Sequence, residues 1–427
     1  MAKKKLLFFS IFIIIILVFV TIYNIIYKNN NIYLNNKDAA PNFISIMLEE
    51  TAGSGEYKVS KSNKWPSKGY VFNKEMSYCN NGSTLTWNEN DNSVSVNINK
   101  TDKCYVYFDI ARYDQYCNNN TLACYTAKKF TGTQGDNGMY YHDSSLANGA
   151  GDNSYRYVGA NPNNFVCFGS DASTCPDDNL YRIIGVIDGK VKLIKYDYAN
   201  SNLLGTDGDY STSTYSKSNI STYKGKLTSV NTYYWNKSNT NTWSESLLNK
   251  TNLNINFINN IGSAWANKIA TTTWKVGGNK MVPIADAVPS IAYKNEIINP
   301  AENTTYNAKI GLIYASDYGF AASPSAWITK LSSYNSSTAT SANWMYMGAY
   351  EWTISRNSGF SNFVFRIYAD GILCDYGVSS YLAVRPSFNL TSSTSYVSGS
   401  GSMTDPIRIN WLTTVLKKHR WNQDKMR

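Results

Sequence analysis

The chain has 427 residues, of which only 16% are charged, and a formal net charge of +10. Four lysines in residues 1–30, and six basic residues against one acid in residues 408–427, account for nearly all of that charge. The residues between them lack the basic stripe that nucleic-acid binding requires, so no nucleic-acid partner is expected. The 34 tyrosines and 11 tryptophans, with abundant Asn, Ser, Thr and Gly, favour a β-rich extracellular protein.

The N-terminal region has three lysines, Lys3, Lys4 and Lys5, before an apolar run that extends from Leu6 to Ile26. A helix needs about 20 apolar residues to cross a membrane, and flanking lysines favour the cytoplasmic side. We therefore expect a single-pass, uncleaved transmembrane signal-anchor over residues 6–26 in the cell membrane. Residues 1–5 would be cytoplasmic, residues 27–41 a spacer, and the C-terminal ectodomain extracellular. A cleaved signal peptide is the alternative, but no small-residue cleavage site follows the run closely.

Residues 42–110 alternate between polar and apolar side chains, which is typical of strands with one buried face. The alternation is clearest in residues 83–87, 93–99 and 103–109, with Asn- and Asp-rich turns between them. We predict a small antiparallel β domain. Residues 111–154, whose second half is rich in Gly, Asn and Asp, are predicted to be a linker.

Residues 155–410 are predicted to form a larger α+β domain of short strands and long loops. Asp188-Gly189 between two apolar runs is a strong signal for a two-residue hairpin. Residues 201–241 are polar and of low complexity, which indicates a loop excursion or a flexible insertion. Residues 242–260 have apolar side chains at helical spacing and predict one or two short helices, and the basic residues 411–427 predict a solvated tail. Strands are expected at residues 164–168, 180–187, 190–195, 310–316, 363–368 and 382–390.

Seven cysteines occur without a CxxC pair, so no metal site is expected from them. In an extracellular region disulfides are their natural use. Spacing favours the pairs Cys117–Cys124 and Cys167–Cys175, with Cys79–Cys104 as a third, although spacing does not fix the connectivity. Cys374 is left over, and a buried free cysteine is the simplest interpretation.

Four segments, YRYVGAN (155–161), LYRIIGVI (180–187), IGLIYASDYGF (310–320) and AVRPSFNL (383–390), resemble an uncharacterised family of surface-protein domains from low-GC Gram-positive bacteria. Residues 44–109, with WPSKGYVFN and CNNGSTLTW, resemble the small β unit that often precedes that domain. The elements Tyr350-Glu351-Trp352-Thr353 and Val384-Arg385-Pro386 are distantly similar to the C-type-lectin-like superfamily that includes formylglycine-generating enzymes. This resemblance implies a C-type-lectin-like fold for residues 155–410. It does not carry over the redox activity, which needs a cysteine pair where only Cys374 is present.

Catalytic chemistry finds little support in the sequence. The two histidines, His142 and His419, fall in the predicted linker and the tail, which argues against a histidine-dependent nucleophile. Glu351, with Asp317 and Asp370, is a candidate for a cell-wall glycan hydrolase, but a buried structural role suits Glu351 better. The aspartates in residues 171–178 and 207–209 lack calcium-loop spacing, so a role in turns is expected. No enzyme activity, cofactor or metal is therefore expected.

A recognition surface is the leading hypothesis for residues 344–381, where aromatic side chains alternate with Ser, Asn and Gly. Trp352 and Trp344 are expected in the core. We expect a ligand-binding or adhesion ectodomain whose partner is an extracellular glycan or protein; a structural, pilus-like subunit and the glycan hydrolase are the alternatives. The candidate ligand-binding residues are Tyr346, Tyr350, Arg356, Arg366, Tyr368, Tyr376 and Tyr381.

Overall fold

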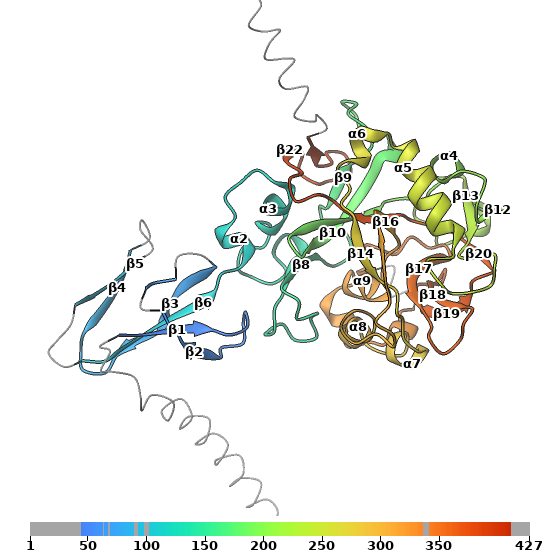
Figure 1. Ribbon diagram of the computed structural model, residues 1–427. Coiled ribbons are helices and arrows are strands. Elements are labelled where there is room, and N and C mark those ends of the chain that lie inside the picture. The colour runs from blue at the N-terminus through green and yellow to red at the C-terminus, as the bar shows by residue number, and fades with distance from the viewer. Residues whose placement is uncertain are drawn as a thin grey trace, which may run out of the picture. The chain divides into compact units, whose positions relative to one another are not determined.

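The computed structural model describes residues 44–410, apart from residues 63, 67–68, 89–92, 98–101 and 336–340. The described chain is rich in strands and divides into two compact units (Figure 1). The first unit comprises residues 44–49 and 57–109, and the second comprises residues 50–56 and 110–410.

The predicted fold class needs a correction, because it began with a transmembrane helix. No helix within residues 44–410, as far as these are described, is long and apolar enough to span a membrane. The run from Leu6 to Ile26 that prompted the prediction lies outside the described residues, as do the predicted spacer, 27–41, and the tail, 411–427. The structure supports a β-rich protein of two units.

The first unit is a sheet of mixed direction accompanied by a hairpin. Its described strands are β1 (Ile44–Glu49), β2 (Tyr57–Val59), β3 (Tyr70–Cys79), β4 (Thr84–Asn88), β5 (Ser93–Asn97) and β6 (Cys104–Ile110). The sheet has the order β2-β1-β6-β3, and β4 pairs with β5. Strands β1 and β6 run parallel, with Ile44 opposite Cys104. The predicted antiparallel domain is wrong in this respect, because alternation along a strand indicates its buried face but not the direction of its neighbour.

Aromatic side chains form much of the small core of the first unit. Phe72 of β3 stacks on Trp87 of β4 with ring centroids 5.3 Å apart, and both rings lie close to the fully buried Phe108. The Cys79–Cys104 disulfide joins the end of β3 to the start of β6. The bond therefore closes the loop that carries the β4-β5 hairpin onto the sheet.

The second unit is built on one antiparallel sheet in the order β16-β21-β11-β10-β8-β7, with β9 also pairing with β10. Asp188 and Gly189, both with positive φ, form the turn between β10 and β11, as predicted. Its strands are β7 (Met139–His142), β8 (Ser154–Tyr157), β9 (Phe165–Cys167), β10 (Leu180–Ile187), β11 (Lys190–Lys195), β16 (Ile310–Gly311) and β21 (Ser387–Asn389).

Smaller sheets surround this one (Figure 1). They are β12 (Tyr210–Ser216) with β13 (Ser229–Tyr234) and β20 (Tyr381–Leu382); β14 (Thr272–Lys275) with β15 (Thr305–Ala308); β17 (Glu351–Arg356) with β18 (Phe363–Ile367) and β19 (Leu373–Gly377); and β22 (Tyr396–Ser398) with β23 (Arg408–Ile409). The helices among the described residues are short. They are α2 (Tyr113–Tyr116), α3 (Leu122–Ala127), α4 (Ser201–Leu204), α5 (Phe257–Asn260), α6 (Ser263–Ala266), α7 (Met281–Ile284), α8 (Pro289–Tyr293) and α9 (Ala315–Phe320), with 3-10 or π turns η1 (Asp136–Gly138), η2 (Asp177–Asn179), η3 (Lys217–Asn219), η4 (Leu248–Asn256), η5 (Lys294–Ile298), η6 (Pro324–Ala326) and η7 (Leu331–Ser333).

Two segments that the sequence assigned to irregular structure are ordered parts of this unit. Residues 111–154 are not a linker, because they form α2, α3, η1 and β7, and Leu122 and Met139 are fully buried. His142, predicted outside the core, is likewise fully buried. Residues 201–241 are not a loop excursion, because they contribute β12 and β13. The helical prediction for residues 242–260 corresponds to η4 and α5.

The predicted disulfides are confirmed as cysteine pairs at bonding distance. The sulfur atoms are 1.99 Å apart in Cys79–Cys104, 2.16 Å in Cys117–Cys124 and 2.03 Å in Cys167–Cys175. Cys374 of β19 is free, but it is partly exposed, so the prediction of a buried cysteine is wrong in that respect.

Opening the disulfide of the first unit tests its contribution to stability. The bond spans 25 residues, and closing a loop of that size in the unfolded chain stabilises the fold by roughly 3 kcal/mol. We expect Cys79→Ser with Cys104→Ser to speed amide hydrogen exchange in residues 44–109. Cys374→Ser is the matched control and should leave exchange unchanged. Equal exchange in all three proteins would show that the bond adds no stability.

Candidate functional site

The candidate site begins at Arg366, in the middle strand of the β17-β18-β19 sheet. Arg366 lies opposite Trp352 of β17 and Cys374 of β19. Tyr376, two residues beyond Cys374, is its diagonal neighbour on the same face. The Arg366 guanidinium lies 3.6 Å from the centroid of the Tyr376 ring, which is a stacking distance.

Two further tyrosines extend this face at the end of the strands. Tyr350 precedes β17 and Tyr368 follows β18, and their rings meet edge to face with centroids 4.7 Å apart. The Arg366 guanidinium lies 5.2 Å from the first ring and 4.9 Å from the second. A hydrogen bond to Tyr368, together with burial, raises the pKa of Tyr350. Three tyrosine rings thus surround one guanidinium.

The β12-β13-β20 sheet adds the remaining tyrosines. The ring of Tyr215 in β12 lies 5.8 Å from that of Tyr350, and its hydroxyl donates to the backbone oxygen of Tyr381 at 2.8 Å. Tyr381 packs against Tyr234 of β13, with ring centroids 5.9 Å apart. We call the set of Arg366, Tyr215, Tyr234, Tyr350, Tyr368, Tyr376 and Tyr381 the tyrosine–arginine cluster.

Arg366 is a buried cation without an anionic partner among the described residues. Only 8% of its surface is exposed, its Nε atom is buried without a hydrogen-bond acceptor, and no described carboxylate forms an ion pair with it. Burying a charge without a partner is costly, and the tyrosine rings offset only part of that cost. Tyr376 and Tyr381, by contrast, are 38% and 41% exposed. The cluster therefore presents aromatic surface next to an unsatisfied cation.

The predicted site residues divide into those that this cluster contains and those that lie elsewhere. Tyr350, Arg366, Tyr368, Tyr376 and Tyr381 come together as described. Tyr346 is buried and donates its hydroxyl to the backbone oxygen of Ala369. Arg356 pairs with Glu302 at 2.6 Å and donates to the backbone oxygen of Gly277.

The low-complexity composition of residues 201–241 predicts a loop, so the sequence does not point to Tyr215 and Tyr234 as site residues. The period-two pattern YSTSTYS at residues 210–216 was the signal that could have indicated a strand there. Trp344 and Trp352 are 3% and 0% exposed, which confirms both as core residues.

Glu351, the candidate acid of a hydrolase, is committed to a buried ion pair. One carboxylate oxygen accepts a hydrogen bond from Nε of Arg385 at 2.9 Å, the other lies 2.8 Å from Nη2, and both side chains are 1% exposed. Asp317, proposed beside it, instead lies within ion-pair distance of Arg156 and Lys192. The carboxylates do not form the exposed pair that glycoside hydrolysis needs.

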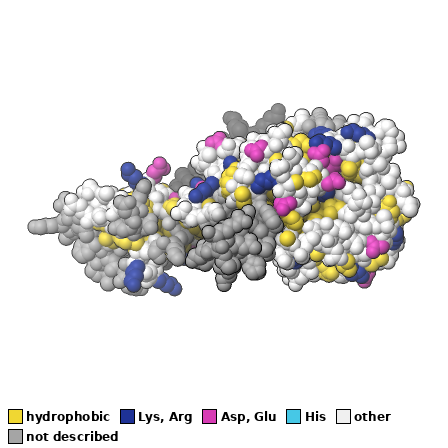
Figure 2. All heavy atoms as spheres, turned by 90° about the horizontal axis from the view of Figure 1, so that it is seen from above, with side chains coloured by type: hydrophobic (Ala, Val, Ile, Leu, Met, Phe, Trp, Pro, Cys, Tyr) yellow, Lys and Arg dark blue, Asp and Glu magenta, His cyan; other side chains and the backbone are white. Residues whose placement is uncertain are grey.

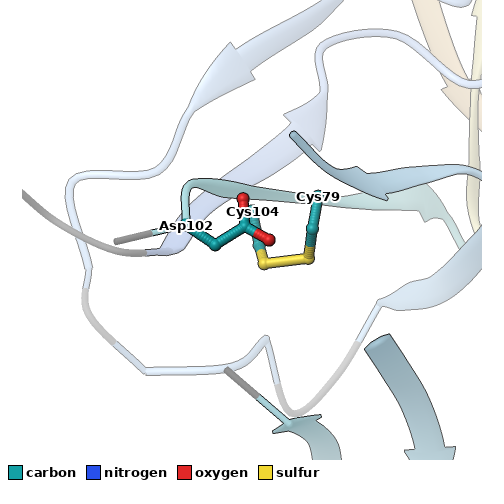
Figure 3. A group of neighbouring side chains, drawn as sticks. All are labelled: Cys79, Asp102 and Cys104. Atoms are coloured by element: carbon teal, nitrogen blue, oxygen red, sulfur yellow. A yellow bond between two sulfur atoms is a disulfide. The ribbon is translucent and has the colours of Figure 1, made fainter. Parts of the chain in front are cut away.

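The first unit brings Cys79, Asp102 and Cys104 together in an arrangement that resembles a set of metal ligands (Figure 3). Both sulfur atoms are in the disulfide, which removes them as ligands. The Asp102 carboxylate accepts backbone N–H groups of Asn81, Ser83 and Lys103 at 2.7–2.8 Å. Although burial opposes ionisation, these hydrogen bonds lower the pKa of Asp102 to about 2. The carboxylate therefore stabilises a turn.

Glu296 has a buried carboxyl group whose pKa is raised into the range of proton transfer near neutral pH. It is 2% exposed, and burial raises its pKa to about 7, against the effect of hydrogen bonds from Ser316 and Ser355. One oxygen accepts the Ser316 N–H at 2.7 Å, and the other accepts the Ser355 hydroxyl. Both oxygens are thus occupied inside the protein, which suits a structural role.

Charge on the surface is dispersed. Figure 2 shows basic and acidic side chains interspersed over the visible face, with uncharged atoms covering most of it. This agrees with the near-neutral composition outside the basic ends of the chain. No broad basic area for a nucleic acid is visible on that face.

The comparisons with known proteins give no further information about the site. No protein-family model matches the chain, and neither does any curated protein or solved structure. The resemblances to a surface-protein family and to the C-type-lectin-like superfamily therefore stay predictions that these comparisons do not test.

The raised pKa of Glu296 predicts a pH dependence of stability. An unfolded carboxyl with a pKa of 4.5 loses its proton before the folded one does, so this group's contribution to the free energy of unfolding falls as pH rises from about 4.5 to 7. Glu296→Gln removes the titration. Relative to the wild type, the variant should gain on the order of 3 kcal/mol across that window in urea denaturation.

The comparison at equal pH cancels the titration of all other groups. Glu245→Gln, at an exposed carboxylate that accepts the Thr240 hydroxyl, which an amide oxygen can also do, is the control and should show no comparable gain. A constant difference between Glu296→Gln and the wild type from pH 4.5 to 7 would show that folding does not raise the pKa of Glu296.

Proposed function

We propose that this protein is a non-enzymatic binding protein that works outside the reducing cytoplasm, and that its tyrosine–arginine cluster recognises a glycan bearing an anionic group. The observation that carries the proposal is Arg366, a nearly buried guanidinium without an anionic partner among the described residues. A bound carboxylate or sulfate would supply that partner.

The geometry around Arg366 suits an anion from outside. Tyrosine rings lie 3.6, 4.9 and 5.2 Å from the guanidinium, so they hold it by their faces and provide no anion themselves. A guanidinium has five N–H donors in a planar fork that matches a carboxylate. Charge-assisted hydrogen bonds of this kind are about twice as strong as neutral ones.

The exposed part of the cluster favours a glycan over a folded protein. Tyr376 and Tyr381 are partly exposed, whereas Tyr215, Tyr350 and Tyr368 are half-buried. A rigid aromatic ring offers a flat face to an apolar ligand face at a low cost in conformational entropy. A few rings suffice for one or two sugar residues, whereas a stable protein interface buries about 800 Å² on each partner.

The disulfides support a location outside the cytoplasm. Three cysteine pairs lie at bonding distance, one in the first unit and two in the second. Such bonds persist in oxidising surroundings and are rare where thiols are kept reduced. An extracellular glycan is available in the same compartment.

Arg366→Gln tests the proposal directly. We expect the full chain to bind carboxylated or sulfated glycans on an array, and this variant to bind them at least about tenfold more weakly. Because burying an unpaired charge is costly, removing it should leave the free energy of unfolding unchanged or raise it. Tyr376→Ala should weaken binding as well, because it removes the ring closest to the guanidinium.

Arg356→Gln is the matched control, because Arg356 lies in the same sheet but is already paired with Glu302. It should bind the same glycans as the wild type. A blank array, or equal binding by the Arg356 and Arg366 variants, would contradict the proposal. Strong destabilisation by Arg366→Gln without loss of binding would assign Arg366 to packing alone.

A further inference from the structure

A second concave site lies on the main sheet of the second unit and shares no residue with the tyrosine–arginine cluster. It is a cavity of about 340 Å³, which is close to the lower end of ligand-binding pockets, roughly 300 Å³. Its walls include Trp274 of β14, Tyr293 of α8 and Tyr314 before α9. Its floor is polar and comes from the sheet itself.

The floor is a row of residues paired across four neighbouring strands. Arg156 of β8 lies opposite Gly185 of β10, Gly185 lies opposite Lys192 of β11, and Lys192 lies opposite Asn389 of β21. Directly paired residues point to the same face. Gly185 contributes no side chain to this row, and a Cβ there would lie 2.0 Å from the backbone oxygen of Tyr155, so the strands approach closely at this point.

Asp317 at the start of α9 reaches this floor and joins the two cations. Its carboxylate lies 3.3 Å from Nη1 of Arg156 and 2.5 Å from Nζ of Lys192. The Lys192 ammonium also lies 4.7 Å from the Tyr314 ring and 5.6 Å from the Trp274 ring. The walls therefore hold the cation in place at the base of the cavity.

Some N–H donors of Arg156 and Lys192, at the floor of the cavity, have no hydrogen-bond partner among the described residues. Arg156 uses three of its N–H groups, on Ser154, Asp317 and Asp152, and Lys192 uses one, on Asp317. A guanidinium has five N–H donors and an ammonium has three. These side chains are only 2% and 5% exposed, and both line the cavity, so a ligand would reach the remaining donors from inside the cavity.

The charge of the lining is positive in sum. Four basic side chains line the cavity, against Asp188 and Asp317 in the lining and Asp152, which pairs with Arg156 at 2.7 Å, so the excess is one positive charge. Lys190 and Lys275 are the half-buried basic residues that complete the four. An excess of cations in a concave, poorly solvated site attracts anions, because field lines are focused there.

We propose that this cavity binds a small oxyanion-bearing molecule of about monosaccharide size, with its carboxylate or phosphate on Arg156 and Lys192. Its ring or carbon skeleton lies against Trp274 and Tyr314. The proposal does not depend on glycan binding at the tyrosine–arginine cluster, because the two sites have separate residues.

The experiment titrates the full chain with glucuronate and with glucose 6-phosphate by isothermal calorimetry, with glucose as the uncharged probe. Both charged probes should bind and glucose should not, and binding should weaken as salt is added. The rim variant Lys190→Ala with Lys275→Ala should weaken binding of the charged probes by roughly tenfold. Lys330→Ala, at an exposed lysine outside the cavity, is the matched control and should bind as the wild type does.

Lys192→Met removes the cation of the floor and should abolish binding, with folding monitored by circular dichroism. If that variant does not fold, the proposal is judged on the binding of the charged probes to the rim variant, Lys190→Ala with Lys275→Ala. Absence of binding by both charged probes at roughly 10 mM overturns the proposal, as does equal binding by the rim variant and the control. Arg366→Gln should leave binding of these probes unchanged, which separates this test from that of the glycan site.

Discussion

The buried ion pair between Glu351 and Arg385 is the interaction on which the arrangement of the second unit depends. Arg385 precedes β21 of the main sheet, and Glu351 begins β17 of the three-stranded sheet that carries Arg366. Both partners are 1% exposed, and Arg385 Nη2 also donates to the backbone oxygen of Met345 at 2.6 Å. Backbone hydrogen bonds between Trp352 and Ala383, and between Ala383 and Tyr350, run alongside the pair. The ion pair and these hydrogen bonds thereby join the two sheets next to Tyr350, a member of the tyrosine–arginine cluster.

Arg366 differs from two other buried arginines, Arg385 and Arg182, in the acceptors that surround its guanidinium. Arg385 has a carboxylate, and Arg182 has three neutral acceptors, the Asn164 side chain and the backbone oxygens of Trp344 and Pro162. Burial still lowers the pKa of Arg182 to about 9. These two buried guanidinium groups thus have acceptors, whereas among the described residues Arg366 has aromatic rings as its neighbours and no carboxylate as an ion-pair partner. An unsatisfied cation beside exposed tyrosines is consistent with a role in binding.

Local patterns predicted the features that depend on neighbouring residues. Short spacing indicated the Cys117–Cys124 and Cys167–Cys175 pairs, and Asp188-Gly189 marked the β10-β11 turn. Contacts between segments that are distant in sequence could not be predicted from such local patterns. The parallel contact of β1 with β6 and the approach of Tyr215 to Tyr350 depend on tertiary structure, which a periodic pattern does not encode. Arg356 is close to the site residues in sequence, which is why it is predicted among them. In the structure it lies at the other end of β17, opposite Val364, and pairs with Glu302.

The most direct test of this account is a double-mutant cycle on the Glu351–Arg385 pair in the full chain, with Glu351→Gln, Arg385→Met and the double variant measured by urea denaturation. Each single change leaves a buried polar or charged group without its partner and should cost about 3–5 kcal/mol. The double variant should cost clearly less than the sum of the two, with a coupling free energy of at least about 2 kcal/mol. Two small losses that add without coupling would contradict the claim that this pair holds the two sheets together.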